Sequence, residues 1–258
     1  MKKLLVANLK MNIVSVEQRD LYIAGIESRC SDMMAHTDVV ICPSTIDLHA
    51  FEKLGTCGVH IGAQDLSWKE KGAFTGETSP KRLYEYGVRH AIVGHSERRL
   101  YYNESDAMIG EKVESAIRNG ITPIVCVGES AEARRGDHPF EHVREQITAS
   151  VSALTSGGEL AKIIFAYEPV WAISTNHTVN DPQITANDIL SAKVEIIKTL
   201  TEIYDRTFAS QARILYGGSV SAENAHEVCI VPEMDGVLVG SASADPGRFA
   251  AIAQQLKS

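Results

Sequence analysis

A glutamate at the end of a strand-like run is the residue of this chain best placed to support chemistry. The run Lys162–Tyr167 is rich in Ile, Phe and Ala, which predicts a buried strand, and Glu168 follows it directly. Pro169 comes next and stops the strand, because proline has no N–H and a fixed φ. Glu168 is therefore a candidate general base held at a strand end, while the alternative is a solvated loop acid, the commoner fate of a glutamate.

Other polar or small residues also follow short apolar runs. A carboxylate and an imidazole that face one another can serve as base for a carbon acid and as donor to an oxygen where enediolate charge develops, and an ammonium favours that charge. Small-residue turns let backbone N–H groups approach an anion, which predicts a phosphorylated substrate. Each residue alone also has an ordinary structural explanation. The residues are Asn8, Lys10 and Asn12, then His95, Ser96, Glu97 and Arg98, then Gly217, Gly218 and Ser219, and lastly Gly240 and Ser241.

Eight apolar runs of strand type alternate with segments of helical period. The runs show no in/out alternation, which is typical of parallel strands covered by helices on both sides. Eight such units in 258 residues predict an α/β fold, a single (β/α)8 (TIM) barrel over residues 1–258, in which side chains at the carboxyl ends of the strands meet on one face. The runs are Leu4–Leu9, Asp38–Cys42, Val59–Ala63, Ala91–Gly94, Thr122–Val127, Lys162–Tyr167, Arg213–Tyr216 and Gly236–Val239.

Helix starts and helix stripes agree with this alternation. Ser79-Pro80 and Asp245-Pro246 place a capping side chain before proline at the first helical position, and Thr185 is followed three residues later by Asp188. Apolar residues also recur at helical spacing and predict the buried stripes of two helices. These are Ile109, Val113 and Ala116 in one helix, and Ile189, Ala192, Ile196, Leu200 and Ile203 in the other.

Composition predicts a packed globule and limits the partners. The chain is 44% hydrophobic and 22% charged, with a net charge of −8, which argues against a general nucleic-acid or membrane-surface binder but leaves room for a small anion at a local positive site. No run has the length of a membrane span or of a signal-peptide core, so a cytoplasmic location is predicted. Five scattered cysteines without a Cys-x-x-Cys pair fit a reducing compartment and argue against a thiolate metal site.

Motifs along the whole chain resemble the triosephosphate isomerase family. Their order and number make the resemblance specific. They are Asn8-Leu9-Lys10-Met11-Asn12, Gly62-Ala63-Gln64-Asp65, Gly72-Ala73-Phe74-Thr75-Gly76-Glu77, Val93-Gly94-His95-Ser96-Glu97-Arg98-Arg99, Cys126-Val127-Gly128-Glu129, Ala166 through Ile173, and Tyr216-Gly217-Gly218-Ser219-Val220.

The resemblance implies an interconversion of dihydroxyacetone phosphate and glyceraldehyde 3-phosphate without cofactor or metal. It assigns Glu168 as the base, His95 as the electrophile, Lys10 as the electrostatic partner and Asn8 as a support. It also implies a homodimer formed through the protruding loop Gly72–Glu77.

Further residues of the site follow from the same resemblance. The substrate is expected to be bound by Ser174, Ser219, Gly240 and Ser241, and the apolar stretch from Val170 to Ile173 is expected to be a lid that excludes water. Ile173 and Leu238 are expected to surround the base.

The chain departs from the family pattern where phosphate is held. Ser174-Thr175-Asn176 stand where the family usually has Gly-Thr-Gly, Gly240-Ser241 replace a Gly-Gly pair, and Leu9 replaces an aromatic residue. A Cβ resists positive φ and takes up space, so these changes are expected to reshape the phosphate pocket through strain. An isomerase of a four-carbon ketose phosphate, of the erythrulose phosphate type, is therefore the alternative.

Two more alternatives belong to other classes. The stretch His138-Pro139-Phe140-Glu141-His142 spells a His-x-x-Glu-His zinc-protease pattern, but it is expected in a barrel helix far from the strand-end face. A weakly active or non-catalytic paralogue is the other, although such a chain would be expected to lose Glu168, His95 or Lys10.

Overall fold

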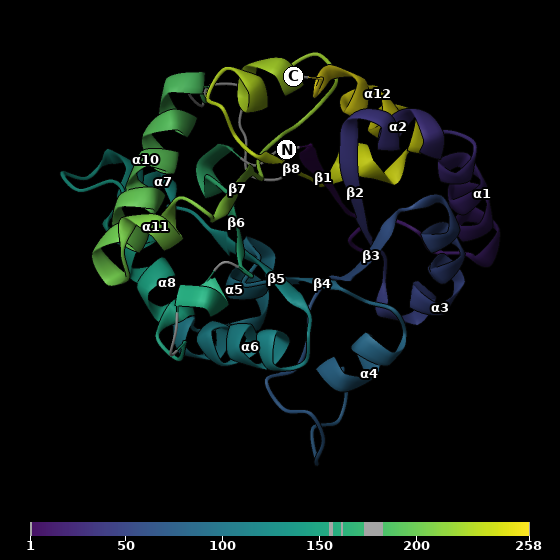
Figure 1. Cartoon of the computed structure of the whole chain (residues 1–258), viewed down its shortest axis with the longest axis horizontal. Coiled ribbons are helices and arrows are strands. Elements are labelled where there is room, and N and C mark those ends of the chain that lie inside the picture. Colours follow the sequence, from purple (N-terminus) through teal and green to yellow (C-terminus); the bar gives the residue numbers. More distant parts are fainter. Residues whose placement is uncertain (1, 155–156, 161, 173–182, 258) are drawn as a thin grey trace.

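The chain folds into a closed barrel of eight parallel strands surrounded by helices (Figure 1). The structure is a computed structural model that describes residues 2–154, 157–160, 162–172 and 183–257. Each strand pairs with the next along the chain, and β1 closes the barrel by pairing with β8, with Leu4 opposite Gly236. The predicted (β/α)8 barrel is confirmed. The strands are β1 (Lys3–Asn8), β2 (Thr37–Cys42), β3 (His60–Ala63), β4 (His90–Val93), β5 (Thr122–Val127), β6 (Ile164–Tyr167), β7 (Arg213–Tyr216) and β8 (Gly236–Val239).

Most predicted strand limits lie within a residue of the observed ones. The largest difference is at β6, which begins at Ile164 and not at Lys162. Lys162 lies in a turn, where its backbone N–H donates to the carbonyl oxygen of Glu159 at 3.0 Å. An apolar run does not show which of its residues belong to a turn and which pair with a neighbouring strand.

Alternation along the strands decides which residues reach the barrel interior. Leu4 and Val6 belong to an apolar cluster inside the barrel, together with Ala166 of β6, whereas the residues between them pack toward the helices. Because side chains alternate along a strand, Asn8 and Glu168 continue these inward series at the carboxyl ends of β1 and β6. The fold thus aims both side chains at the barrel axis.

The helices form the outer layer of the barrel (Figure 1). None of them, in the part of the chain that the structure describes, is long and apolar enough to cross a membrane. The α-helices are α1 (Val16–Glu27), α2 (Cys30–His36), α3 (Leu48–Phe51), α4 (Pro80–Glu85), α5 (Ser96–Tyr102), α6 (Asp106–Arg118), α7 (Ala131–Arg135), α8 (Glu141–Val151), α9 (Gly157–Leu160), α10 (Ala186–Ile203), α11 (Arg206–Ala209) and α12 (Pro246–Gln255). Short 3₁₀ or π segments are η1 (Thr45–Asp47), η2 (Glu52–Cys57), η3 (Val170–Ala172), η4 (His226–Ile230) and η5 (Ser241–Ala244).

Two of the three predicted helix caps are formed. Thr185 and Asp188 make a reciprocal capping box at α10, and the side chain of Asp245 caps α12. Ser79 precedes α4 as predicted but does not cap it, because its hydroxyl donates to the carbonyl oxygen of Glu70 at 2.6 Å. A partner outside the helix has replaced the local one.

The predicted helix stripes are buried with one exception. In α6 all three predicted residues are buried, and in α10 the first four are. Ile203 was expected in the same stripe but is 37% exposed. It is the last residue of α10, where the chain leaves the helix, so periodicity alone extended the stripe too far.

Candidate active site

Glu168 is buried at the carboxyl end of β6 and faces two neighbouring loops. The residue is only 2% exposed, so the alternative of a solvated loop acid is wrong. Its backbone N–H donates to the carbonyl oxygen of Val127 at 2.8 Å, and its Oε2 accepts from the backbone N–H of Ser96 at 3.3 Å. A Cβ at Gly217 would lie 2.7 Å from Cγ of Glu168, so the glycine leaves room for the carboxylate arm.

His95 presents one ring nitrogen to this carboxylate. It lies just before α5, and its Nδ1 accepts the backbone N–H of Glu97 at 3.2 Å. A nitrogen that accepts a hydrogen bond carries no proton, so the proton of the neutral ring is on Nε2. Nε2 lies 3.3 Å from Oε1 of Glu168. The ring is therefore oriented as a hydrogen-bond donor toward the position of the base.

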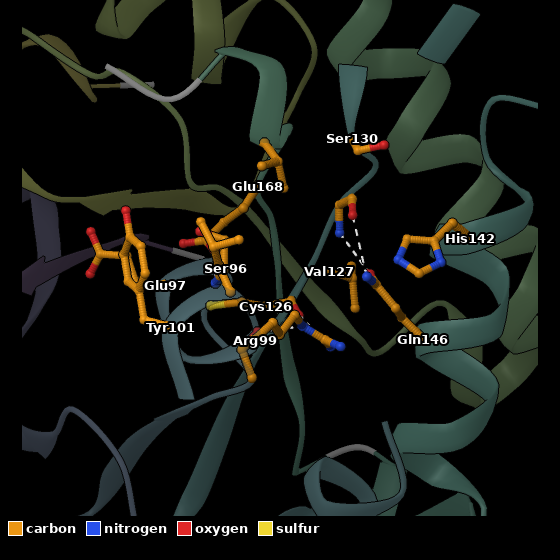
Figure 2. A pocket seen from close by; sticks show the side chains of 14 residues that line it. Ser96, Glu97, Arg99, Tyr101, Cys126, Val127, Ser130, His142, Gln146 and Glu168 are labelled. Atoms are coloured by element: carbon orange, nitrogen blue, oxygen red, sulfur yellow. Dashed lines mark hydrogen bonds between the residues drawn. The ribbon is translucent and has the colours of Figure 1, made fainter. Parts of the chain in front are cut away.

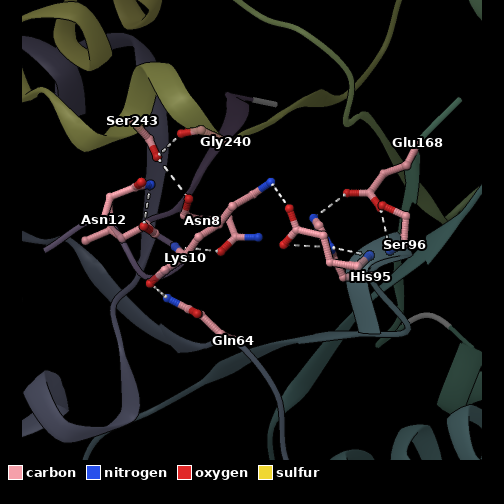
Figure 3. A network of polar contacts seen from close by, with 11 residues as sticks. Asn8, Lys10, Asn12, Gln64, His95, Ser96, Glu168, Gly240 and Ser243 are labelled. Atoms are coloured by element: carbon pink, nitrogen blue, oxygen red, sulfur yellow. Dashed lines mark hydrogen bonds and ion pairs between the residues drawn. The ribbon is translucent and has the colours of Figure 1, made fainter. Parts of the chain in front are cut away.

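The side chain of Lys10, which follows β1, also extends toward His95 and Glu97 (Figure 3). Its Nζ lies 2.5 Å from Oε1 of Glu97, which fixes the ammonium beside His95. The backbone of Lys10 has φ +50, a conformation that side-chain-bearing residues rarely adopt. Asn8 stabilises it by accepting the Lys10 N–H on Oδ1 at 3.1 Å, and Gln64 donates to the Lys10 carbonyl oxygen at 2.9 Å. Strain of this kind concentrates at functional sites.

These residues line one cavity of about 160 Å³ at the carboxyl ends of the strands. Of the predicted site residues, the structure brings together Asn8, Lys10, His95, Glu168, Ser219, Gly240 and Ser241, and Leu238 lies with them as expected. The predicted residue Ser174, together with Ile173, lies outside the described residues. Gly217 and Gly218, predicted as part of a small-residue turn, also line the cavity, as do Asn12, Glu97 and Val220, to which sequence reasoning assigned no specific role. Their positions after strand ends were the available signal.

The two small-residue turns also line the cavity, the turn after β7 next to Glu168 and the turn after β8 next to Lys10. The turn after β7 is held by Asn224, whose side chain donates to the Ser219 carbonyl oxygen at 3.0 Å. In the turn after β8, Ser243 donates through N–H and hydroxyl to the Gly240 carbonyl oxygen, at 2.9 and 2.7 Å. Both turns are thus fixed by their own hydrogen bonds, which leaves the backbone of Gly218 and Ser241 against the cavity.

The expected strain at Ser241 is absent. This residue begins η5, and it is not among the described side-chain-bearing residues with positive φ. A Cβ at Gly240 would also make only ordinary contact, at 3.5 Å from Cε of Lys10. The expectation that serine distorts this turn is wrong, because the turn does not use the conformation that requires glycine.

The start of the expected lid is tied to a buried glutamate. Val170–Ala172 forms η3 directly after Pro169, and Nε1 of Trp171 donates to Oε1 of Glu129 at 2.8 Å. Tyr167 donates its hydroxyl to the same oxygen at 2.8 Å, and burial next to this carboxylate raises the pKa of Tyr167. Glu129 therefore anchors this end of the segment. It was noticed in the sequence only as part of a motif.

A second cavity, of about 320 Å³, lies behind Glu168 (Figure 2). Glu168 lines both cavities and so stands on the wall between them. In this cavity the side chain of Gln146 in α8 forms two hydrogen bonds with the backbone of Gly128. It accepts the Gly128 N–H at 2.8 Å and donates to the Gly128 carbonyl oxygen at 3.3 Å. A Cβ at Gly128 would lie 1.8 Å from the Glu168 carbonyl oxygen, so the two backbones are in direct contact. Gln146 is a supporting residue that no sequence signal marked.

His142 of the zinc-protease pattern lines this second cavity. The pattern was expected far from the strand-end face, and that expectation is wrong, because the start of α8 reaches the region behind the base. His142 Nδ1 lies 3.6 Å from a carboxylate oxygen of Glu145. Among the residues that the structure describes, no group of three His, Cys, Asp or Glu side chains is arranged to hold a metal ion.

Known proteins resemble the chain over almost its whole length. A model of the triosephosphate isomerase protein family matches residues 3–256. The triosephosphate isomerase of Moorella thermoacetica is 41% identical over 252 residues, 97% of each chain. That of Geobacter metallireducens is 42% identical over 216 residues, 83% of this chain and 84% of the relative. That of Lactobacillus delbrueckii subsp. bulgaricus is 38% identical over 250 residues, 96% of each chain.

Proposed function

The chain belongs to the triosephosphate isomerase family, and we propose that it interconverts dihydroxyacetone phosphate and D-glyceraldehyde 3-phosphate through an enediolate. The observation that carries this proposal is the pairing of a buried carboxylate with a donating imidazole, Glu168 and His95, in one cavity beside Lys10. The names of the relatives support the three-carbon pair, and no feature of the described site favours the four-carbon alternative.

In the proposed reaction Glu168 is the base. Its carboxylate takes a proton from the hydroxymethyl carbon of dihydroxyacetone phosphate and returns it to the adjacent carbon, which gives the aldehyde. The hydrogen bond from the Ser96 N–H holds Oε2 of the carboxylate, and it must break when the base turns toward substrate. Because Glu168 lies between two cavities, this turn needs no movement of the barrel.

His95 and Lys10 stabilise the charge that forms on oxygen. Nε2–H of the neutral ring donates to the carbonyl oxygen as it becomes an enediolate and can pass its proton between the two oxygens. The Lys10 ammonium favours the same negative charge; Glu97 holds the ammonium, and Asn8 holds the Lys10 backbone. The phosphate would be bound by backbone N–H groups of the turns at Ser219 and Ser241.

The proposal is tested with a coupled assay on purified protein. Glyceraldehyde 3-phosphate is supplied, and the dihydroxyacetone phosphate formed is reduced by an NADH-dependent dehydrogenase. We expect kcat/KM for the three-carbon aldehyde to exceed that for a four-carbon aldose phosphate more than ~10-fold, a difference of about 1.4 kcal/mol in activation free energy. A preference of that size for the four-carbon substrate would overturn the assignment.

We further propose that two copies associate through the loop Gly72–Glu77. This loop projects from the barrel between β3 and α4 (Figure 1), and Gly72 and Gly76 both have positive φ. Exposed apolar side chains follow the neighbouring strands, including Met11 after β1 and Ile46 after β2, which are 86% and 88% exposed. Tyr101 and Tyr102 of α5 extend this surface after β4. A surface of this kind is a typical protein interface.

Light scattering at micromolar concentration tests the association. The protein is expected at twice the chain mass, and a tetramer would also agree, because dimers can pair further. Met11→Asp is expected to weaken the association. Val194→Asp, at a residue 56% exposed on α10, serves as a control. A fully active monomer would contradict this proposal without affecting the proposed reaction.

A further inference from the structure

Two cysteines lie in contact on the outside of the barrel, at the end remote from Glu168. Cys30 begins α2, which leads into the start of β2, and Cys57 ends η2 just before the start of β3. The catalytic residues follow the carboxyl ends of the strands, so this pair lies at the opposite end of the barrel. Neither cysteine lines either cavity at Glu168.

The two side chains are held close together by their own hydrogen bonds. Sγ of Cys30 lies 3.0 Å from the carbonyl oxygen of Cys57, to which it donates. The thiol of Cys57 donates to the carbonyl oxygen of Leu54 at 3.1 Å, so both side chains have a fixed orientation. The sulfur atoms of a disulfide are about 2 Å apart, so its formation requires the Cys30 side chain, which already contacts the Cys57 backbone, to turn toward the Cys57 sulfur.

The two thiols differ in access to solvent. Cys57 is half-buried, whereas Cys30 is 2% exposed, and the other three cysteines, Cys42, Cys126 and Cys229, are buried. A small oxidant in solution therefore meets Cys57 first. Burial, together with the hydrogen bond to Cys57, raises the pKa of Cys30 to about 12. Cys30, which is buried, therefore reacts second. Because the thiolate is the attacking form, the reaction of Cys30 becomes faster as the pH rises.

We propose that Cys30 and Cys57 form an oxidation-sensitive dithiol that hydrogen peroxide or another small hydroperoxide converts into an intramolecular disulfide. Cys57 sulfur attacks one peroxide oxygen, an S–O bond forms, the O–O bond breaks, and the leaving hydroxide takes a proton to become water. Cys30 sulfur then attacks Cys57 sulfur, the S–S bond forms, the S–O bond breaks, and the hydroxide leaves as water with the Cys30 proton. Two thiols lose two electrons, and one peroxide becomes two waters.

The bond would join two segments that are otherwise linked by non-covalent contacts. It would close a chain loop that contains β2 and α3, which restricts the unfolded chain and stabilises the fold. For a chain of this length we expect the apparent Tm to rise by about 5 °C. The catalytic residues lie at the other end of the barrel, so kcat is expected to stay unchanged.

The whole chain, treated with hydrogen peroxide, is alkylated in denaturant without reductant and mapped by mass spectrometry. We expect a cross-linked peptide containing Cys30 and Cys57, protection of two of the five thiols, reversal by dithiothreitol, and faster formation at pH 9 than at pH 7. Cys57→Ser and, as a second variant, Cys30→Ala should abolish the cross-link and the rise in Tm. Cys229→Ala, which leaves the pair intact, should form it as the unmodified chain does.

Two results would overturn the proposal. In one, Cys57 is recovered as sulfinic acid while Cys30 remains fully alkylated, which would show that the second thiol does not reach the first. In the other, all five thiols stay reduced at a peroxide concentration that fully oxidises free cysteine. A cross-link without any rise in Tm would contradict the stabilising effect.

Discussion

Nε2 of His95 lies 3.3 Å from Oε1 of Glu168, although the two residues come from different strand ends of the barrel. His95 is fixed by the N–H of Glu97, and Glu168 by the N–H of Ser96, so α5 orients both side chains. This arrangement of a ring nitrogen and a carboxylate is the one that the proposed proton transfer between adjacent carbons requires before substrate binds.

Replacing the imidazole tests its role as donor. His95→Gln should lower kcat roughly 100-fold, because the amide polarises the carbonyl oxygen less well and cannot pass a proton between oxygens. KM should change far less. His142→Gln is the matched control, because this histidine lies behind the base and not in the cavity with Lys10, and it should retain kcat within about twofold. Equal loss in both variants would assign the effect to folding.

Gln146 is expected to act as a positioning residue for the base. Gln146→Leu removes both hydrogen bonds to Gly128, whose backbone touches that of Glu168, and should lower kcat roughly tenfold with KM nearly unchanged. Gln146→Glu keeps the hydrogen bond from the Gly128 N–H, so its kcat should lie between that of the unmodified chain and that of Gln146→Leu.

Thr148→Ala, on the exposed side of the same helix, is the control for this series. If Gln146→Leu lowers Tm strongly but leaves kcat unchanged, the residue supports only the fold.

Acid stability should depend on His90 at the other end of the barrel. Burial, helped by His60 and Arg213, lowers the pKa of His90 to about 4. The unfolded chain takes up this proton near pH 6.5, so the stability conferred by the neutral ring is present above that pH and is lost as pH falls toward 4. The free energy of unfolding can fall by about 3 kcal/mol over this pH range.

Urea unfolding between pH 4.5 and pH 7.5 measures this dependence. His90→Gln should flatten the decline, while His49→Gln, at an exposed ring, should leave it unchanged. A decline of equal slope in all three proteins would show that His90 is not responsible.

The serine after β8 should matter little for substrate affinity. Because Ser241 does not occupy the left-handed region, Ser241→Gly relieves no strain there and should change KM for glyceraldehyde 3-phosphate by less than about twofold. A larger fall in KM, measured in the coupled assay, would show that the serine side chain itself obstructs the phosphate.

Local signals predicted the fold and most of the cavity. Eight apolar runs and their spacing gave the barrel, and the barrel rule placed Lys10, His95 and Glu168 together. Contacts between distant parts of the chain were not predictable in this way. The amide of Gln146 reaches Gly128 only because α8 packs beside β5, and Ser79 prefers the carbonyl oxygen of Glu70 to its own helix.

Glu168 is proposed to move the proton between the two carbons, and hydrogen exchange measures this step directly. Dihydroxyacetone phosphate is incubated with the enzyme in D₂O, and deuterium at the hydroxymethyl carbon is followed by proton NMR. The unmodified chain should exchange rapidly, and Glu168→Gln should lower both this exchange and kcat by at least ~10³ with nearly unchanged Tm. Exchange in Glu168→Gln within tenfold of the unmodified chain would place the base elsewhere.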